Sequence, residues 1–399
     1  PGRRLLSRQP QMKPSILIAL PHYRPGWKAG GPTRTIANLV EHLGDEFSFR
    51  ILTSDRDYGD ERAFPGIEAD RWRRLGKADV LYMSPARRGV RAFAHALDGA
   101  DYDALYLNSF FHPQFTVAPL LAYRLGLAKR RPCVIAPRGE FASAALRLKQ
   151  RKKAAYFRTA CAAGLYSGLR WQASSAFEAK DIQRRLSHIA KDIAVVANLP
   201  PAVEDHAAST PEPTGDREPL RLVLLSRVSR MKNIAFAIQA VASSPAPVHL
   251  DIWGAVEDTD YWRECIAATA AMPDHARVEY RGPAPFDRVT EILASYDMLF
   301  LPSQGENYGH VIAESFSAGT PVLISDRTPW RNLQRDGVGW DLPIDEGPAP
   351  FHRAFEEAHK RRNAEGGAWR SRVKSYAARV LLTPDMLQAS RRLFTFQSV

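Results

Sequence analysis

The sequence predicts an α/β protein with two domains, each built around a parallel β-sheet that helices cover on both faces. The chain has 399 residues, which is long for one hydrophobic core and fits two. Short apolar segments with the length of buried strands alternate with helical patterns through both halves. A proline-rich stretch at residues 200–219 separates the halves and has the composition of a linker.

The first half of the chain follows a repeated order of strand, loop and helix. Residues 14–20 (PSILIAL) form a short apolar run that predicts a buried strand. A loop with paired glycines comes next, and residues 33–43 then have the apolar spacing of a helix. Strand, glycine-containing loop and helix in this order open a nucleotide-binding α/β unit. Further strands are predicted at residues 47–54, 103–108 and 133–139, and another helix at residues 116–127.

The second half repeats this alternation after the linker. Strands are predicted at residues 221–228, 248–254, 278–282, 298–303 and 321–325. Helices are predicted at residues 233–242, 261–271, 288–295, 309–318 and 384–394. The predicted units are a first domain at 13–199, the linker at 200–219, a second domain at 220–382 and a C-terminal segment at 383–399. Because ligands bind outside the carboxyl ends of such strands, we expect a cleft between the two domains.

The composition excludes several classes of protein. Apolar residues make up 45% and charged residues 25% of the chain, which excludes a disordered tail, a collagen-like rod and a coiled coil. Cys133, Cys161 and Cys265 lie far apart, so neither a disulfide framework nor a cysteine zinc site is expected. The chain contains no apolar run of about 18 residues and no apolar leader. We therefore expect a soluble, cytoplasmic protein.

The charge balance points to a phosphate-bearing ligand. Basic residues outnumber acidic residues by 55 to 43, a net charge of +12. Such an excess attracts the phosphates of nucleic acid, of an anionic membrane surface or of a phosphorylated small molecule. No nucleic-acid-binding module with base-stacking aromatics is recognisable, so no specific nucleic-acid partner is expected. A non-enzymatic protein that binds polyanions is the alternative function.

The segment at residues 302–325 (PSQGENYGHVIAESFSAGTPVLIS) holds two acidic residues at a spacing of eight. Glu306 lies in a loop after a predicted strand, and Glu314 lies on the predicted helix that follows. Gly309 permits a tight entry into this helix, whose first N–H groups can bind an anion. A carboxylate in the loop can accept hydrogen bonds from sugar hydroxyls, and one on the helix can accept them from a ribose. Taken alone, the two acids are more typical of a solvated helix with one capping residue.

The order of motifs around these acids resembles the donor site of glycosyltransferase family 4. Residues 224–241 (LLSRVSRMKNIAFAIQAV) look like the family's strand, followed by an arginine and a lysine five apart and then a helix. The runs TPW at 328–330 and GVGW at 337–340 resemble its later signatures, so the resemblance covers residues 220–345. Members of this family are retaining enzymes of GT-B architecture, with two Rossmann-like domains and a cleft between them. In such relatives the C-terminal helix packs back on the first domain.

The resemblance implies roles for two basic residues and for the two acids. Arg227 and Lys232 correspond to residues that contact the diphosphate, where fixed cations stabilise the charge of the leaving group. A pair of surface basic residues at a helix entrance is the alternative. Glu306 corresponds to the ligand of the donor sugar, and Glu314 corresponds to the ligand of the ribose. The family's common glycine-phenylalanine-glycine run between the acids is replaced here by Asn307, Tyr308 and Gly309.

Further donor-side candidates lie in both halves of the chain. Gly30 and Gly31 precede a helix and resemble the family's glycine-rich loop facing the diphosphate, although a plain turn is the alternative. Arg281 follows a strand where the family often places residues near the base, and a plain turn is about as compatible. Family members often carry a histidine close to the sugar after the strand at residues 103–108. Asn108 matches that position best, and His112 lies four residues further on; either is a candidate to face the reaction centre.

An acceptor-side segment is expected at residues 133–158 (CVIAPRGEFASAALRLKQRKKAAYFR), which resembles a segment of polysaccharide-building members. Arg138 and Glu140 follow a predicted strand end and are expected to point into the cleft. Lys149 belongs to a dense basic run after them. This run fits a lipid-diphosphate acceptor or an anionic membrane surface, and a solvated helix face is the alternative.

Together these features predict a retaining, metal-independent glycosyltransferase. No D-x-D motif follows a predicted strand, so no metal ligand and no cofactor are expected. The co-substrate is a nucleotide-diphosphate sugar, with UDP or GDP undecided. The implied acceptor is a glycan or a polyprenyl-diphosphate-linked glycan of bacterial exopolysaccharide, capsule or lipopolysaccharide, met in the cytoplasm at the inner face of the membrane. A sugar-nucleotide epimerase or hydrolase on the same scaffold is the alternative enzyme.

Overall fold

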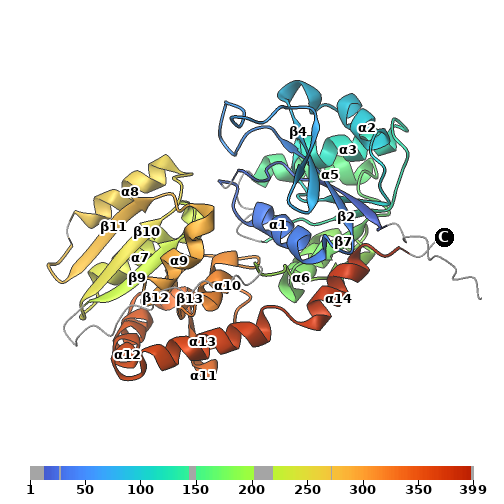
Figure 1. The fold of residues 1–399 in the computed structure, drawn as a ribbon. Helices are drawn as coiled ribbons and strands as arrows, with labels where there is room; N and C mark the ends of the chain where they lie inside the picture. The colour runs from blue at the N-terminus through green and yellow to red at the C-terminus, as the bar shows by residue number, and fades with distance from the viewer. Residues whose placement is uncertain (1–12, 27, 143–149, 202–218, 271, 397–399) are drawn as a thin grey trace, which may run out of the picture.

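The computed structural model describes residues 13–396 apart from residues 27, 143–149, 202–218 and 271, and it contains two α/β domains (Figure 1). An eight-stranded sheet forms the core of the N-terminal domain, and a six-stranded sheet forms the core of the C-terminal domain. The predicted class, α/β with two parallel-sheet domains, is confirmed.

The N-terminal sheet has the strand order β3-β4-β2-β1-β5-β6-β7-β8, and only the β3–β4 pair is antiparallel among its described strands. Its strands are β1 (Ser15–Ala19), β2 (Ser48–Ser54), β3 (Trp72–Leu75), β4 (Ala78–Met83), β5 (Ala104–Leu107), β6 (Cys133–Ile135), β7 (Arg170–Ala173) and β8 (Asp192–Val195). The helices of this domain are α1 (Gly31–Leu43), α2 (Val90–Asp98), α3 (Ala118–Arg124), α5 (Gln150–Ala162) and α6 (Ala176–Leu186).

Helices cover both faces of this sheet, which explains why its central strands, such as β1 and β5, are apolar and buried. Ile16 and Ile18 of β1 pack in a buried cluster that includes residues of α1. Leu17 and Ala19 point to the opposite face and pack in a second cluster, with residues of α2 and α3. Successive side chains of a strand alternate between the two faces of its sheet, so a strand buried on both sides reads as a continuous apolar run.

The C-terminal sheet is parallel throughout its described strands and has the order β11-β10-β9-β12-β13-β14. Its strands are β9 (Leu220–Leu225), β10 (Val248–Trp253), β11 (Ala276–Gly282), β12 (Met298–Leu301), β13 (Val322–Ser325) and β14 (Gly339–Leu342). Its helices are α7 (Ile234–Ala242), α8 (Thr259–Thr269), α9 (Val289–Ala294), α10 (His310–Ser317), α11 (Leu333–Asp336), α12 (Ala349–Glu365) and α13 (Gly367–Val380).

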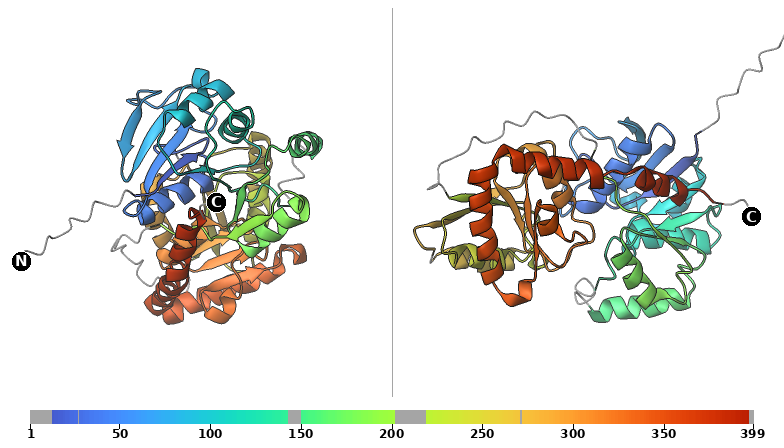
Figure 2. Two further views of the ribbon diagram at one scale, coloured as in Figure 1. Left: turned by 90° about the vertical axis from the view of Figure 1, so that its right-hand side faces the viewer. Right: turned by 90° about the horizontal axis from the view of Figure 1, so that it is seen from below.

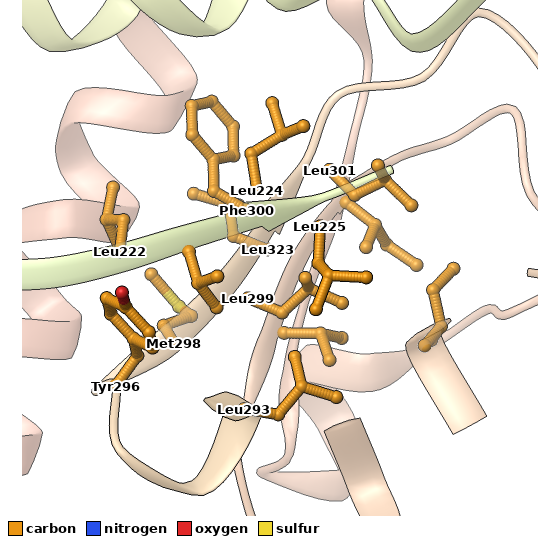
Figure 3. Close-up of a cluster of buried hydrophobic side chains, with 14 of the residues drawn as sticks. Leu222, Leu224, Leu225, Leu293, Tyr296, Met298, Leu299, Phe300, Leu301 and Leu323 are labelled. Atoms are coloured by element: carbon orange, nitrogen blue, oxygen red, sulfur yellow. The ribbon is translucent and has the colours of Figure 1, made fainter. Parts of the chain in front are cut away.

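The two central strands of this sheet, β9 and β12, lie in the main core of the C-terminal domain (Figure 3). The burial of each large apolar side chain contributes on the order of 1.5–3 kcal/mol. The core therefore holds the carboxyl ends of these strands in a fixed position. The side chains labelled in the figure are all at most 8% exposed: Leu222, Leu224, Leu225, Leu293, Tyr296, Met298, Leu299, Phe300, Leu301 and Leu323.

Each sheet has one point at which the direction of strand addition reverses. In the C-terminal domain the chain adds β10 and β11 on one side of β9 and then places β12 on the other side. In the N-terminal domain β2 and β4 lie on one side of β1, and β5 lies on the other. Loops that leave neighbouring strands in opposite directions open a space at the carboxyl ends, and ligands of α/β sheets bind there.

The C-terminal helices connect the two domains. Helix α13 is followed by α14 (Pro384–Leu393), which lies against the N-terminal domain (Figure 2). Arg391 of α14 donates to both carboxylate oxygens of Glu46 at 2.7 Å. The ring of Phe394 packs at 5.9 Å from Phe47 and 5.3 Å from Tyr106. Most of the predicted linker at residues 200–219 lies outside the described residues.

One difference from the predicted elements has a clear local cause. The helix expected at residues 116–127 begins with a π-helical turn (Pro113–Val117) and continues as α3 to Arg124. It ends early because Gly126 adopts a left-handed conformation, with φ of 68°, which a glycine readily accepts. Across the part of the chain that the structure describes, we find no helix with the length and apolar character needed to cross a membrane.

Candidate functional site

Lys232 and Glu306 form an ion pair at the reversal point of the C-terminal sheet. Lys232 follows β9, and Glu306 follows the neighbouring strand β12. The Lys232 Nζ atom lies 2.5 Å from Glu306 Oε1, and the two side chains are only 16% and 10% exposed. The structure therefore brings together the predicted diphosphate ligand and the predicted sugar ligand.

Hydrogen bonds between the two loops explain this contact. The Ser303 hydroxyl and the Gln304 N–H both donate to the carbonyl oxygen of Met231, at 3.0 Å and 2.8 Å. The Asn233 side chain donates to the carbonyl oxygen of Pro302 at 3.1 Å. Asn233 adopts a left-handed conformation, with φ of 57°, which asparagine accepts more readily than most residues. The loop after β12 is thus tied to the turn that carries Lys232.

Arg227 faces the glycine turn of the N-terminal domain. Its guanidinium donates to Glu257 Oε2 at 2.8 Å. A Cβ atom built on Gly30 would lie 3.6 Å from Arg227 Nε, so the two residues approach each other across the domain boundary. Gly30 itself has a φ of 72°. The structure brings these two predicted residues together, whereas Glu257 carried no signal in the sequence pattern.

The loop between the two predicted acids is supported by side-chain packing and by a hydrogen bond. Gly309 has a φ of 77°, and a Cβ atom there would lie 2.7 Å from the Ile312 side chain. The Trp330 indole donates to the carbonyl oxygen of Tyr308 at 2.6 Å, and the two rings lie 5.7 Å apart. The TPW run therefore supports the predicted donor loop, residues 306–309, through Trp330. Burial raises the pKa of Tyr308.

Glu314 forms an ion pair with Arg34 of the N-terminal domain. Arg34 lies on α1, and its Nη1 atom contacts Glu314 Oε1. Glu314 is 7% exposed, and its second oxygen, Oε2, has no hydrogen-bond partner among the described residues. Burial, followed by the charge of Arg24, lowers the pKa of Arg34 to about 10. The sequence motifs did not predict a role for Arg34. The available signal was its position three residues after Gly31.

A second contact between α1 and α10 involves His310. The His310 Nε2 atom lies 2.8 Å from the Thr35 hydroxyl oxygen. A Cβ atom on Gly31 would lie 3.7 Å from the His310 ring, so the predicted glycine turn is enclosed between Arg227 and His310. Burial, followed by the charges of Arg34 and Arg138, lowers the pKa of His310 to about 3.

Arg138 and Asn108 hold each other within the N-terminal domain. The Arg138 guanidinium donates to Asn108 Oδ1 at 3.0 Å and 2.6 Å, and to Asn198 Oδ1 at 2.8 Å. Asn108 is 2% exposed. Next to Arg138, a Cβ atom on Gly139 would lie 3.0 Å from Asn307 Cβ. The Asn108–Arg138 unit therefore lies beside the predicted donor loop of the other domain.

Glu140 and His112 organise the loop after β5. The Glu140 carboxylate accepts from the Ser109 hydroxyl at 2.8 Å and from the Phe110 N–H at 2.5 Å. Burial raises the pKa of Glu140, and these hydrogen bonds oppose the shift. His112 Nδ1 accepts from the Phe115 N–H at 3.1 Å and so caps the turn that follows. Burial, followed by the nearby His22 and Arg88, lowers the pKa of His112 to about 4.

A charged cluster lies at the carboxyl ends of β1, β2 and β4, and the sequence pattern did not predict it. Asp55 is 3% exposed and accepts from Arg56 at 2.9 Å and from Arg88 at 2.6 Å. His22 Nδ1 lies 3.4 Å from the carbonyl oxygen of Arg56. The residues come from three separate loops, so no local spacing could have grouped them.

Two predicted residues lie elsewhere or outside the described chain. Arg281 is on β11 at the edge of its sheet, where it pairs with Asp251 at 2.8 Å and with Glu279 at 2.5 Å. None of these contacts places Arg281 beside the Lys232–Glu306 pair. Lys149 lies outside the described residues. Within the described part of the chain, His, Cys, Asp and Glu side chains form no group of three that could hold a metal ion.

Comparison with known sequences identifies the family signature of the C-terminal domain. Residues 209–360 match the family described as "Glycosyl transferases group 1". This segment contains Arg227, Lys232, Glu306 and Glu314. A D-inositol 3-phosphate glycosyltransferase of Geodermatophilus obscurus is 29% identical over 139 residues, which is 32% of this chain. The match spans 30% of that relative's own length.

Comparison with solved structures extends the likeness to nearly the whole chain. Anabaena HepE, solved in complex with UDP-glucose, has a TM-score of 0.66 and 16% identity, covering 95% of this chain and 98% of that one. WaaG, described as a glycosyltransferase involved in lipopolysaccharide biosynthesis, has a TM-score of 0.64 and 14% identity, covering 95% and 99%. At these identities the likeness is one of fold, and the fold is the GT-B architecture.

Proposed function

We propose that this protein is a retaining glycosyltransferase that moves a sugar from a nucleotide-diphosphate sugar to a glycan or a lipid-linked glycan. The observation that carries the proposal is the Lys232–Glu306 pair at the reversal point of a parallel α/β sheet, where ligands of such sheets bind. Arg227 lies on the same side and faces the glycine turn of the other domain. The match to group 1 glycosyl transferases covers these same residues.

Arg227 and Lys232 stabilise the leaving group in the proposed reaction. Cleavage of the bond between the sugar C1 atom and the phosphate oxygen leaves negative charge on the nucleoside diphosphate. Two cations already held in place lower the free energy of that charge without further reorganisation. Glu257 holds Arg227, and Glu306 holds Lys232, at 2.8 Å and 2.5 Å.

The proposed stereochemical course is retention by front-face attack, as the family resemblance implies. The acceptor hydroxyl oxygen bonds to C1 on the side from which the diphosphate departs, and its proton passes to the departing phosphate oxygen. This scheme needs neither a protein nucleophile nor a metal ion. Glu306 accepts hydrogen bonds from the donor sugar, and Glu314 Oε2 accepts from the ribose.

The acceptor belongs on the N-terminal side of the site. The loop after β5 carries Asn108 and His112, and Glu140 fixes that loop. Helix α5 adds exposed basic residues, Lys152 and Arg158, in a chain with a net charge of +12. Such a helix fits the diphosphate of a polyprenyl carrier and the anionic inner face of the cytoplasmic membrane. We therefore propose a role in bacterial surface polysaccharide synthesis, with the protein cytoplasmic and peripheral on that membrane.

A transfer assay tests this function. The protein is incubated with UDP- and GDP-sugars and with a polyprenyl-diphosphate-linked sugar or a short glycan, and the anomeric configuration of the product is read by NMR. We expect the configuration of the donor to be retained, at a rate that EDTA does not change. Lys232→Ala should lower the rate by about 100-fold or more, since it removes a preorganised charge.

Arg230→Ala is the matched control for this assay. Arg230 lies in the same turn as Lys232, but its guanidinium pairs with Glu264 on the surface at 2.6 Å, so its loss should leave the rate unchanged. An inverted product would contradict the proposed mechanism. Release of free sugar at the same rate with and without acceptor would instead indicate a hydrolase or an epimerase.

A further inference from the structure

The buried imidazole of His310 has no role in the reaction as proposed so far. His310 is the first residue of α10 and is 9% exposed. Its ring lies 4.9 Å from the Tyr308 ring, and a Cβ atom on Gly31 would approach it to 3.7 Å. The side chain therefore lies at the boundary between the donor loop and the glycine turn.

We assign the proton of the neutral His310 ring from the hydrogen bonds around it. The Thr35 hydroxyl donates to the carbonyl oxygen of Gly31, one helical turn earlier, at 3.0 Å. Its single proton is used in that bond, so Thr35 Oγ1 can only accept from His310 Nε2, which lies 2.8 Å away. The neutral ring then carries its proton on Nε2 and a lone pair on Nδ1. Burial and the charges of Arg34 and Arg138 keep the ring neutral, because they lower its pKa to about 3.

Two hydrogen-bond acceptors on one face of α10 have no partner among the described residues. One is His310 Nδ1, and the other is Glu314 Oε2. Residues four apart on a helix lie one above the other on the same face. Both side chains are fixed from the N-terminal domain by α1, His310 through Thr35 and Glu314 through Arg34. A buried acceptor without a donor is unfavourable, so a group that brings a donor to each of these atoms would be stabilising.

We propose that His310 Nδ1 and Glu314 Oε2 together accept hydrogen bonds from the two hydroxyls of the donor's ribose. His310 would then determine specificity for ribonucleotides over deoxyribonucleotides, as a residue additional to Glu314. This inference rests on the proposed function, because it assumes that a nucleotide-sugar occupies the site. A vicinal diol supplies two O–H donors on adjacent atoms, whereas a phosphate oxygen supplies none and would face two lone pairs.

Two substitutions test the roles of the two nitrogen atoms of His310 separately. In His310→Gln the terminal amide N–H can replace Nε2–H toward Thr35, but nothing replaces the Nδ1 acceptor. In His310→Asn the side-chain oxygen stands near the position of Nδ1, but the hydrogen bond to Thr35 is lost. The first variant should therefore lose ligand recognition, and the second should lose stability.

The experiment measures dissociation constants by calorimetry for UDP and GDP and for the 2′-deoxy and 3′-deoxy form of each. For the diphosphate that the native protein binds, we expect His310→Gln to weaken binding of the ribose form about tenfold. One of the two deoxy forms should bind this variant and the native protein equally, since it lacks the hydroxyl that His310 would accept. His310→Asn should melt at a lower temperature while it keeps the preference for ribose.

Other outcomes would overturn the inference in distinguishable ways. Unchanged binding in His310→Gln, or equal weakening for the ribose form and both deoxy forms, would show that His310 does not read a ribose hydroxyl. If His310→Gln does not fold, loss of the ribose preference in His310→Asn would contradict the proposal equally. Binding of neither UDP nor GDP to the native protein would instead remove the donor site itself, and the proposed function with it.

Discussion

At the scale of single residues, the charged groups of the proposed site are held by partners within the protein. Lys232 is paired with Glu306, and Arg227 is paired with Glu257. The sequence motif predicted Lys232 and Arg227 because both lie in one local run after a strand. It could not predict the partnership of Arg34 with Glu314, since 280 positions separate the two residues and only the meeting of the domains joins them.

Protonation of His112 should make the stability of the protein depend on pH. The ring accepts from the Phe115 N–H through Nδ1 and is neutral, because burial and then His22 and Arg88 lower its pKa to about 4, from 6.5. The unfolded chain binds this proton more readily, so its contribution to stability is fully present above about pH 6.5 and is lost as the pH falls toward 4. The slope from this one residue is at most about 1.4 kcal/mol per pH unit. Thermal unfolding between pH 7 and 4.5 measures it.

His112→Asn is the matched control for the pH prediction. An asparagine side chain can accept from the Phe115 N–H as a helix cap, but it does not titrate. We therefore expect the variant to lose less stability than the native protein across this pH range. Parallel curves for the two proteins would show that His112 is not the titrating group.

At the scale of secondary-structure elements, the site depends on the close approach of the segments that follow β9 and β10. Gly254 follows β10 with a φ of 149°, and a Cβ atom there would lie 1.7 Å from the carbonyl oxygen of Ser226. Its N–H donates to the carbonyl oxygen of Gly282 at 2.8 Å. This close approach leads β10 into the loop that carries Glu257, the partner of Arg227.

Gly254→Ala should therefore destabilise the C-terminal domain by about 3 kcal/mol, because the added methyl group meets backbone that cannot move aside. Gly282→Ala provides the control within the same sheet. Gly282 also has a positive φ, of 79°, but nothing lies within 4 Å of its Cβ position, so only the backbone penalty of about 1 kcal/mol is expected. Chemical denaturation of both variants measures the difference, and equal losses would contradict the packing argument.

Most elements could be predicted from the sequence because apolar runs are a local signal. The predicted strands at residues 14–20 and 298–303 contain β1 and β12. Strand β3 gave no comparable signal, since Trp72 and its neighbours on this strand are largely exposed. The carboxylate of Glu140, expected to point into the cleft, accepts from the Ser109 hydroxyl and neighbouring N–H groups. A carboxylate that caps its own domain and one that faces a ligand have the same local sequence.

At the scale of the whole molecule, the proposed donor site combines residues of both domains. The C-terminal domain supplies Arg227, Lys232 and the two acids, and the N-terminal domain closes it with the glycine turn and α1. Helix α14 reaches from the second domain to the first and adds the Arg391–Glu46 pair. The motif resemblance covered residues 220–345, so the sequence indicated one half of this site more clearly than the other.

Thermal unfolding with UDP and with GDP tests the central claim, that Arg227 and Lys232 form a donor diphosphate site. The native protein is compared with an Arg227→Ala, Lys232→Ala double variant and with Arg230→Ala as the surface control. One diphosphate should stabilise the native protein and the control, by about 2.7 kcal/mol at a hundredfold excess over its dissociation constant, and should not stabilise the double variant. Equal stabilisation of the double variant, or no stabilisation of any protein by either diphosphate, would contradict the account.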